Sequence, residues 1–192
     1  MRHDLTLDAA GLRLVPLGAE HAPAMLPLID DGMWAGMVTP TPRSEEDVLS
    51  RVEAALAAPG TFAFTVLGPD GDVRGWTSFY DVVPAQGRCE IGSTWYARQW
   101  WGGVTNPACK LALMTHAFEE WQMHRVAFRA DARNARSIAA ISRLGAKAEG
   151  VLRGHRVAAD GSRGDTAYFS VLADEWPRVR DGLRERLGLS RP

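Results

Sequence analysis

Apolar and polar positions follow two different periods along the chain, and the switches between these periods predict the order of its elements. Runs of apolar and β-branched residues bounded by turn residues are typical of strands, and apolar residues recurring every three or four positions are typical of a helix face. The predicted strands are residues 12–17, 62–67, 74–83, 89–97, 126–130, 147–157 and 166–172. The predicted helices are residues 20–30, 44–59, 106–121, 135–144 and 175–187.

The stretch from Glu90 to Trp121 organises this pattern. A strand-like run passes into a turn with Gly102 and Gly103, and a helix is then predicted with Asn106 as N-cap and Pro107 in the first turn. The free amides before such a helix are a ready site for an anion, and a phosphate is the expected occupant. The turn is neither a P-loop nor a dinucleotide fingerprint, because Gly-Lys-Ser/Thr and G-x-G-x-x-G are both absent.

Two other stretches stand out. Ser44 and Asp47 form a capping-box pattern at the start of a helix. Residues 31–43 contain two glycines and two prolines with Met33, Trp34 and Met37, which predicts an irregular loop with exposed apolar side chains. This loop either tucks its aromatic side chain into the core or covers an acceptor site as a lid.

Composition limits what the chain can be. With 192 residues, of which 46% are hydrophobic, one domain spanning 1–192 is expected. The 22 basic and 23 acidic residues nearly cancel, so no overall field favours nucleic acid or an anionic membrane as a partner, and an anion site must be local. Cys89 and Cys109 lack metal-ligand companions, no long apolar run is present, and a cytoplasmic protein is the simplest interpretation.

Two motifs in the second half of the chain resemble those of a known family. Gln99, Gly102 and Val104 resemble the Q/R-x-x-G-x-G/A pattern of the GCN5-related N-acetyltransferases (GNAT), although the valine departs from it. We expect the Val104 amide to face the phosphates and its side chain to turn toward the helix or core. The downstream segment from Asp131 to Arg153, DARNARSIAAISRLGAKAEGVLR, is similar to the RimJ/RimL branch of that family. The resemblance is strong from Glu90 onward and rests on layout alone before it.

The resemblance implies a fold and an activity. The fold would be α/β, with a mixed, mostly antiparallel sheet of about seven strands, helices on both faces and the order βααβββαβαββ. The activity would be transfer of an acetyl group from acetyl-CoA to a primary amine by direct attack on the thioester, without a metal. The acceptor would be a protein N-terminus or a small molecule, and a homodimer is frequent among similar proteins.

The family's binding residues carry over position by position. The resemblance implies a pyrophosphate on the turn amides, a pantetheine arm paired with the preceding strand, and further contacts from the start of the next helix. The implied cofactor-binding residues are Trp95, Tyr96, Ala97, Gln99, Gly102, Gly103, Val104, Thr105, Asn134 and Ser137. Arg98, Arg133 and Arg136 are candidates for neutralising phosphates, although arginines beside helices are usually solvated.

Glu90 is the leading candidate for the general base, because it opens the strand that faces the cleft. A paired, structural glutamate is the alternative, with Arg88 as a partner. Ser137 would lie near the sulfur as an acid or water anchor, and Tyr168 is a candidate acid. His155 and Asp165 are further candidates for the base, and as residue types they are more often structural.

The acceptor's own pKa decides how much a base is needed. At pH 7 an α-amine with a pKa near 7.8 is ~15% neutral, whereas a lysine with a pKa near 10.4 is ~0.04% neutral. A site without an assured base therefore suits an α-amine or a small-molecule amine better than a lysine. An acyl-CoA-sensing protein without turnover is the second hypothesis, because Val104 and Ala108 replace the Gly/Ala and the acidic residue that are common in the family.

Overall fold

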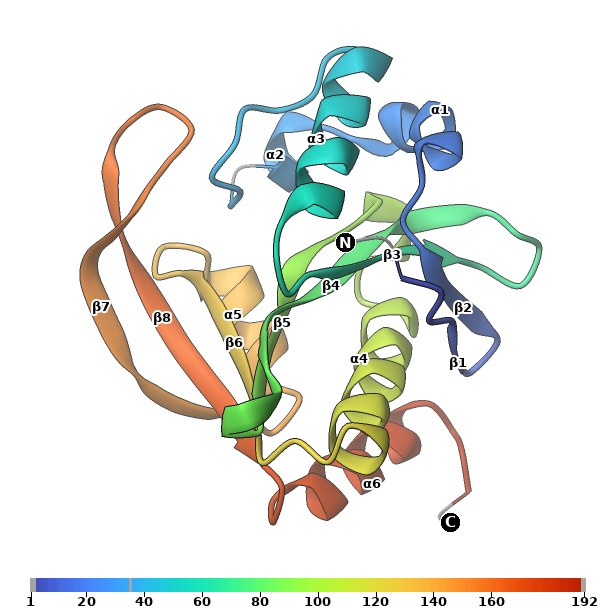
Figure 1. Ribbon diagram of the computed structural model, residues 1–192, viewed down its shortest axis with the longest axis vertical. Coiled ribbons are helices and arrows are strands. Elements are labelled where there is room, and N and C mark those ends of the chain that lie inside the picture. Colours follow the sequence, from blue (N-terminus) through green and yellow to red (C-terminus); the bar gives the residue numbers. More distant parts are fainter. Residues whose placement is uncertain (1–2, 35, 191–192) are drawn as a thin grey trace.

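The computed structural model describes residues 3–34 and 36–190, and its described strands form one eight-stranded sheet (Figure 1). The strand order is β1-β2-β3-β4-β5-β6-β8-β7, with β5 and β6 parallel and the other neighbouring pairs antiparallel. The strands are β1 Leu7–Ala9, β2 Leu12–Pro16, β3 Phe62–Leu67, β4 Val73–Val83, β5 Arg88–Tyr96, β6 Arg125–Asp131, β7 Lys147–Val157 and β8 Arg163–Leu172. The predicted mixed sheet is confirmed, with β1 as a short addition at one edge.

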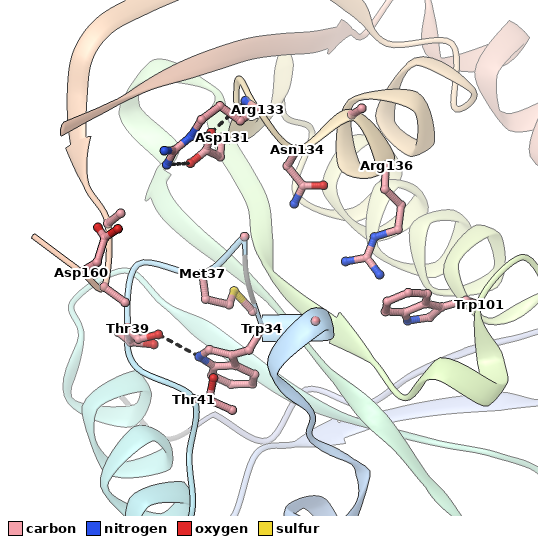
Figure 2. A pocket seen from close by; sticks show the side chains of 15 residues that line it. Trp34, Met37, Thr39, Thr41, Trp101, Asp131, Arg133, Asn134, Arg136 and Asp160 are labelled. Carbon is pink, nitrogen blue, oxygen red and sulfur yellow. Dashed lines mark hydrogen bonds and ion pairs between the residues drawn. The ribbon is translucent and has the colours of Figure 1, made fainter. Parts of the chain in front are cut away.

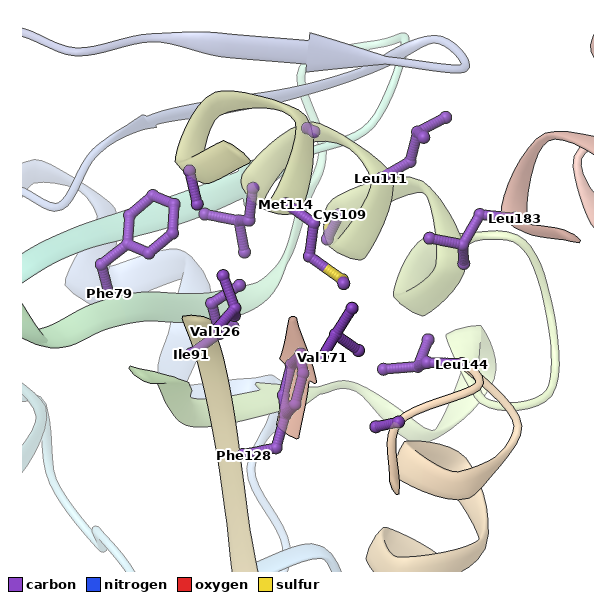
Figure 3. Packing of buried hydrophobic residues seen from close by; sticks show 14 of the residues in the cluster. Phe79, Ile91, Cys109, Leu111, Met114, Val126, Phe128, Leu144, Val171 and Leu183 are labelled. Atoms are coloured by element: carbon purple, nitrogen blue, oxygen red, sulfur yellow. The ribbon is translucent and has the colours of Figure 1, made fainter. Parts of the chain in front are cut away.

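The helices lie on both faces of the sheet, as predicted. They are α1 Ala22–Met25, α2 Asp31–Trp34, α3 Glu45–Ala57, α4 Thr105–Thr115, α5 Ala135–Ser142 and α6 Trp176–Arg186. One buried cluster joins α4, α5 and α6 to one face of the sheet, and a second joins α1, α2 and α3 to the other. Figure 3 shows the first cluster, where Cys109 and Met114 of α4 meet strand residues such as Val171.

Two predictions about the first third of the chain are corrected. The predicted helix at 20–30 is split into 3₁₀ turns on either side of a single α-turn, and Pro23 and Pro27, which lack a backbone N–H, lie inside it. The predicted loop at 31–43 begins with the one-turn helix α2, in which Met33 and Trp34 are buried rather than exposed. The aromatic side chain is thus tucked into the core.

The sheet opens between its two parallel strands. β5 and β6 pair only from Arg88 to Glu90 and from Arg125 to Ala127. Beyond these residues β6 continues along β8, so the β6-facing edge of β5 has no ladder partner in the described chain. A bulge accompanies the divergence, because Ser93 has a φ of 46° and the register with β4 shifts between Gly92 and Trp95. Bulges bend the strand that carries them, and this bend leaves an unpaired backbone edge inside the sheet.

Candidate active site

A cavity of about 1190 Å³ lies where β5 leaves β6. Its wall comes from β4, β5 and β6, from the start of α4, from one side of α5 and from β7. Side chains on both faces of the sheet contribute, among them Tyr80 and Arg129 on one side and Ile141 and Leu144 on the other. The cavity therefore runs through the gap in the sheet.

The predicted glycine turn is present at the mouth of α4. Gly102 has a φ of 75°, a conformation that other residues rarely adopt, and Gly102 and Gly103 both line the cavity. The helix begins two residues earlier than predicted, because Val104 and not Asn106 is the N-cap. The amides of the first turn are therefore those that come after Val104, and the anion site expected there stays a prediction.

Three predicted cofactor residues of this turn do not line the cavity. Gln99 is exposed, and Thr105 is buried with its hydroxyl accepting a hydrogen bond from Arg74 at 3.4 Å. Val104 keeps a negative φ, −78°, and its side chain is 49% exposed. The expectation that this side chain turns toward the helix or core is wrong, since at the N-cap position it points away from the helix's buried face.

The strand predicted to pair with the pantetheine arm, β5, has unpaired backbone groups along only part of its length. Trp95 and Tyr96 line the cavity, and the carbonyl of Tyr96 accepts a hydrogen bond from the Trp101 indole at 2.7 Å. Ala97 donates its N–H to the Arg74 carbonyl and accepts a hydrogen bond from the Trp100 N–H, so both of its backbone groups are already paired. The free edge available for a bound chain therefore ends before Ala97.

Asn134 and Ser137 lie together at the start of α5, as predicted. The Asn134 side-chain oxygen caps the helix by accepting the Ser137 N–H at 3.0 Å, and both residues line the cavity. The cap leaves the amide nitrogen of Asn134 as a donor. Asn134 thus performs the ordinary structural task of its position while presenting a polar group to the cavity.

The three candidate arginines differ in their partners. Arg98 holds Asp30 through two hydrogen bonds, and Arg133 holds Asp131 at 2.9 Å. The hydrogen bond from Arg133 lowers the pKa of Asp131 to about 2. Arg136 instead lies over the Trp101 ring at 3.6 Å and lines the cavity, without an ion pair in the described chain. Arg136 is therefore the candidate whose charge is available to a ligand.

Glu90 lies behind Arg129 and is not among the described residues that line the cavity. Its carboxylate is 3.3 Å from the Arg129 Nε, and its side chain is 10% exposed. The same guanidinium donates hydrogen bonds to the Tyr80 hydroxyl at 3.0 Å and the Tyr168 hydroxyl at 3.1 Å. The predicted partner of Glu90, Arg88, instead pairs with Asp81. Glu90 and Tyr168 thus share a cluster centred on an arginine that the sequence did not single out.

The Tyr80 hydroxyl, unlike Glu90, belongs to a residue of the cavity wall. Burial, together with the charge of Glu90, raises the pKa of Tyr80, so the phenol stays protonated at neutral pH. Of the other candidates, His155 lines the cavity and shares a hydrogen bond with Thr166 at 3.1 Å, whereas Asp165 accepts the Gly154 N–H and does not line it.

Sequence reasoning also missed Lys110. This residue lines the cavity from the second turn of α4 and is 5% exposed. Its spacing from Asn106, four residues, places the two side chains on one face of the helix. The spacing of Lys110 from Asn106 could have indicated its position beside the cavity, but the surrounding apolar residues suggested only a helix packed on the sheet.

A smaller cavity of about 610 Å³ adjoins the first and shares Met37, Asn134 and Arg136 with it. It lies between the segment after α2, the start of α5 and the turn between β7 and β8. Figure 2 shows Arg136 beside Trp101 and the Trp34 indole bonded to the Thr39 carbonyl. Arg156 of β7 donates to the Gly36 carbonyl at 3.0 Å and so joins the hairpin to this segment.

Comparison with known proteins identifies the arrangement. A family model described as an acetyltransferase (GNAT) domain matches residues 11–147. The chain belongs to the GNAT acetyltransferase family. This family uses acetyl-CoA.

Several named proteins and solved structures are similar to the chain. A protein of Bacillus subtilis named as a ribosomal N-acetyltransferase, YdaF, is 35% identical over 108 residues, which span 56% of this chain and 57% of that protein. A structure of a protein named as an acetyltransferase from T. thermophilus is 34% identical with a TM-score of 0.90, covering 97% of this chain and 99% of that one. Mycobacterium smegmatis RimJ, in complex with CoA-disulfide, shares the fold at 22% identity and a TM-score of 0.79, covering 96% of this chain and 93% of that one.

These findings confirm the predicted family and the assignment to acetyltransferases, and the name of the relative YdaF agrees with the predicted RimJ/RimL-type branch. The match to YdaF spans little more than half of that protein's length. Among the described residues, no helix is both long and apolar enough to cross a bilayer. The same part of the chain holds no group of three or more His, Cys, Asp or Glu side chains placed to bind a metal ion.

Proposed function

We propose that the chain transfers the acetyl group of acetyl-CoA to a primary amine by direct attack of the amine on the thioester. The observation that carries this proposal is the gap between β5 and β6. The gap gives a bound chain a free strand edge to pair with, and its cavity connects the glycine turn of α4 to Asn134 and Ser137 of α5. A strand edge beside a helix N-terminus suits a ligand with an amide-bearing arm and a phosphate end.

Each part of the donor has a counterpart in the cavity. The pyrophosphate would meet the amides after Gly102 and Gly103, with Arg136 beside them. The pantetheine arm would pair with the edge of β5 before Ala97, and the Asn134 amide nitrogen would hold it from the side of α5. No metal is needed in this scheme, because the thioester already contains a good leaving group.

The reaction is a single displacement. The nitrogen–carbon bond forms as the carbon–sulfur bond breaks, CoA leaves as a thiolate that takes up a proton, and the attacking amine loses one. Ser137 lines the cavity and is the proposed proton source or water anchor for the sulfur. Glu90 is the proposed final proton acceptor, reached through Tyr80 or water, because Arg129 and Tyr80 separate it from the cavity.

The proposed acceptor is an α-amine, and specifically a protein N-terminus. The acid among the described cavity residues is Asp131, whose pKa of about 2, set by its hydrogen bond with Arg133, makes it a weak base. A site with a shielded Glu90 suits an amine that is already ~15% neutral at pH 7 far better than a lysine. The name of the relative YdaF, a ribosomal N-acetyltransferase, is consistent with an amine acceptor on a protein.

The sensing hypothesis gains no support from the two positions that prompted it. Val104 is half exposed and outside the cavity wall, which supports a pyrophosphate position that its side chain leaves open. Ala108 is fully buried in the core, and the cavity wall there comes from Asn106, Pro107 and Lys110. A single domain, a homodimer and a cytoplasmic location stay predictions.

Thiol release from acetyl-CoA tests the proposed function. The protein is incubated with acetyl-CoA and a panel of peptides with free N-termini, matched peptides with blocked N-termini and an internal lysine, and small amines. We expect release with free N-termini and at least a hundredfold less with the blocked, lysine-bearing peptides. Binding of acetyl-CoA without release for any acceptor would favour the sensing protein.

A further inference from the structure

Lys110 lies at a place where the cavity, the bulged strand and α4 meet. Its side chain is 5% exposed, it lines the larger cavity, and its Nζ is 3.3 Å from the Thr94 hydroxyl at the β5 bulge. The sequence contains two lysines, Lys110 and Lys147, among 22 basic residues. Lys147 is a surface residue paired with Glu175, so the two lysines have opposite environments.

The ammonium of Lys110 is short of partners. An ammonium has three N–H donors, and the structure pairs Lys110 with Thr94 alone, with no carboxylate within ion-pair distance in the described chain. Thr94 is itself engaged, since its hydroxyl bonds to that of Thr77 at 2.7 Å and to the Gly92 carbonyl at 3.2 Å. Burial lowers the pKa of Lys110 to about 8, so the charged form still predominates at pH 7.

Burying the Lys110 ammonium with a single weak hydrogen-bond partner costs free energy of folding, unless a ligand supplies further acceptors. Removing such a group from water without compensating hydrogen bonds opposes folding, and large costs of this kind usually mark functional sites. The neighbouring ionisable groups do not compensate. Cys109 is neutral because burial raises the pKa of its thiol to about 11, and Arg74, whose charge also acts on Cys109, has the same sign of charge as Lys110.

The position of Lys110 along α4 indicates which part of a ligand it meets. Lys110 follows Thr105, at the helix start, by five positions, which is about 7.5 Å along the axis at ~1.5 Å per residue. A phosphate held by the free amides lies before the first turn. Lys110 therefore faces the part of the ligand that extends beyond the phosphate into the gap, at the free edge of β5.

We propose that Lys110 is a binding residue that donates hydrogen bonds to a carbonyl oxygen of the acyl-pantetheine arm in the gap between β5 and β6. This inference rests on the proposed function, because it takes acetyl-CoA as the ligand. The arm offers amide carbonyls, present in CoA and in acetyl-CoA alike, which are acceptors that the unused N–H donors of Lys110 require. The contact would fix the depth of the arm and hence the position of the thioester.

The test compares CoA with 3′-phospho-ADP, which carries the phosphates of CoA and lacks its pantetheine arm. Dissociation constants are measured by calorimetry at pH 7 for the wild type, Lys110→Met, Lys110→Gln and the control Lys147→Met. We expect Lys110→Met to weaken CoA binding at least tenfold and to change 3′-phospho-ADP binding less than threefold. Lys110→Gln keeps a donor and should fall between Lys110→Met and the wild type, and Lys147→Met should match the wild type.

The outcomes separate this inference from the proposed function. If the wild type binds no CoA, the proposed function fails and takes the inference with it. If the wild type binds CoA and Lys110→Met binds it equally well, the inference alone is overturned. Equal loss of CoA and 3′-phospho-ADP would assign Lys110 to the phosphates and overturn the contact with the arm. Thermal melting of each variant confirms that it is folded, and Lys110→Gln provides the same comparison if Lys110→Met does not fold.

Discussion

Gly102 combines a backbone requirement with a position on the cavity wall. Its φ of 75° disfavours any side chain, and no atom lies within 4 Å of a Cβ added there, so a side chain would project into open space. Gly102→Val should therefore abolish the stabilisation by CoA, which at 100 times the dissociation constant is worth ~2.7 kcal/mol. The measurement is a thermal scan with and without CoA.

Gly71 provides a matched control for this substitution. Its φ of 79° and its empty surroundings resemble those of Gly102, and it lies in the turn between β3 and β4, outside the cavity wall. Both valine variants should lose about 1–2 kcal/mol of stability without ligand, because both place a β-branched residue in the left-handed region. Gly71→Val should retain the full shift with CoA, and a normal shift for Gly102→Val would show that the turn is misassigned.

Val104 should tolerate replacement, even though it departs from the family pattern. Its amide contribution to the turn does not depend on its side chain, which is 49% exposed. Val104→Gly should change the dissociation constant for acetyl-CoA less than tenfold, under about 1.4 kcal/mol, as measured by calorimetry. A larger gain, or acetyl transfer that appears only in the glycine variant, would show that valine obstructs the site.

For single residues, the sequence predicted which backbone conformations need glycine better than it predicted where side chains point. The need for glycine at position 102 comes from a local turn and was predictable. The direction of Val104 depended on where α4 begins, and Pro107 did not fix that point, because any position of the first helical turn accepts a residue without an N–H.

The start of α3 shows an element whose signal is wholly local. The Ser44 hydroxyl accepts the Asp47 N–H at 3.1 Å, and the Asp47 carboxylate accepts the Ser44 N–H at 3.0 Å. Ser44→Ala should lower the free energy of unfolding by ~1 kcal/mol, measured by urea denaturation. Ser50→Ala, at an exposed site within the same helix, should stay within about 0.5 kcal/mol of the wild type. Equal losses in the two variants would contradict the cap.

Elements defined by local signals were therefore predictable, and elements shaped by distant contacts were not. The capping box and most strand boundaries needed only neighbouring residues. The gap between β5 and β6 depends on which strand each one pairs with, and the bulge at Ser93 has no sequence signal comparable to a Gly-bearing turn. The residues beside the gap could be named only because the family resemblance placed them.

For the molecule as a whole, Lys110 should link stability to pH. Burial lowers its pKa from the ordinary lysine value of 10.5 to about 8. Between pH 8 and pH 10.5, Lys110 carries its extra proton in the unfolded chain more often than in the folded protein. Its contribution to stability therefore rises with pH in this range. Cys109 acts in the opposite direction, because burial raises its pKa from 9.0 to about 11, so its contribution to stability falls as pH rises above about 9. A comparison of the wild type with a Lys110 variant that keeps Cys109 cancels this contribution.

Lys110→Met removes this dependence. At pH 7 the variant should be more stable than the wild type by roughly 3 kcal/mol, and the difference should shrink as pH rises from 8 toward 10.5. Denaturant unfolding of both proteins at several pH values measures this difference in the free energy of unfolding. A difference that is constant with pH would show that the ammonium is not desolvated in the folded protein.

A crystal structure with bound CoA would show whether the opened sheet holds an acyl-pantetheine arm. We expect the pyrophosphate on the amides after Gly102 and Gly103, and the arm between β5 and β6 beyond the Glu90–Ala127 pair, within hydrogen-bond distance of Lys110. CoA bound elsewhere, such as in the smaller cavity beside Asp160, or β5 and β6 closed together with CoA outside the sheet, would contradict this expectation.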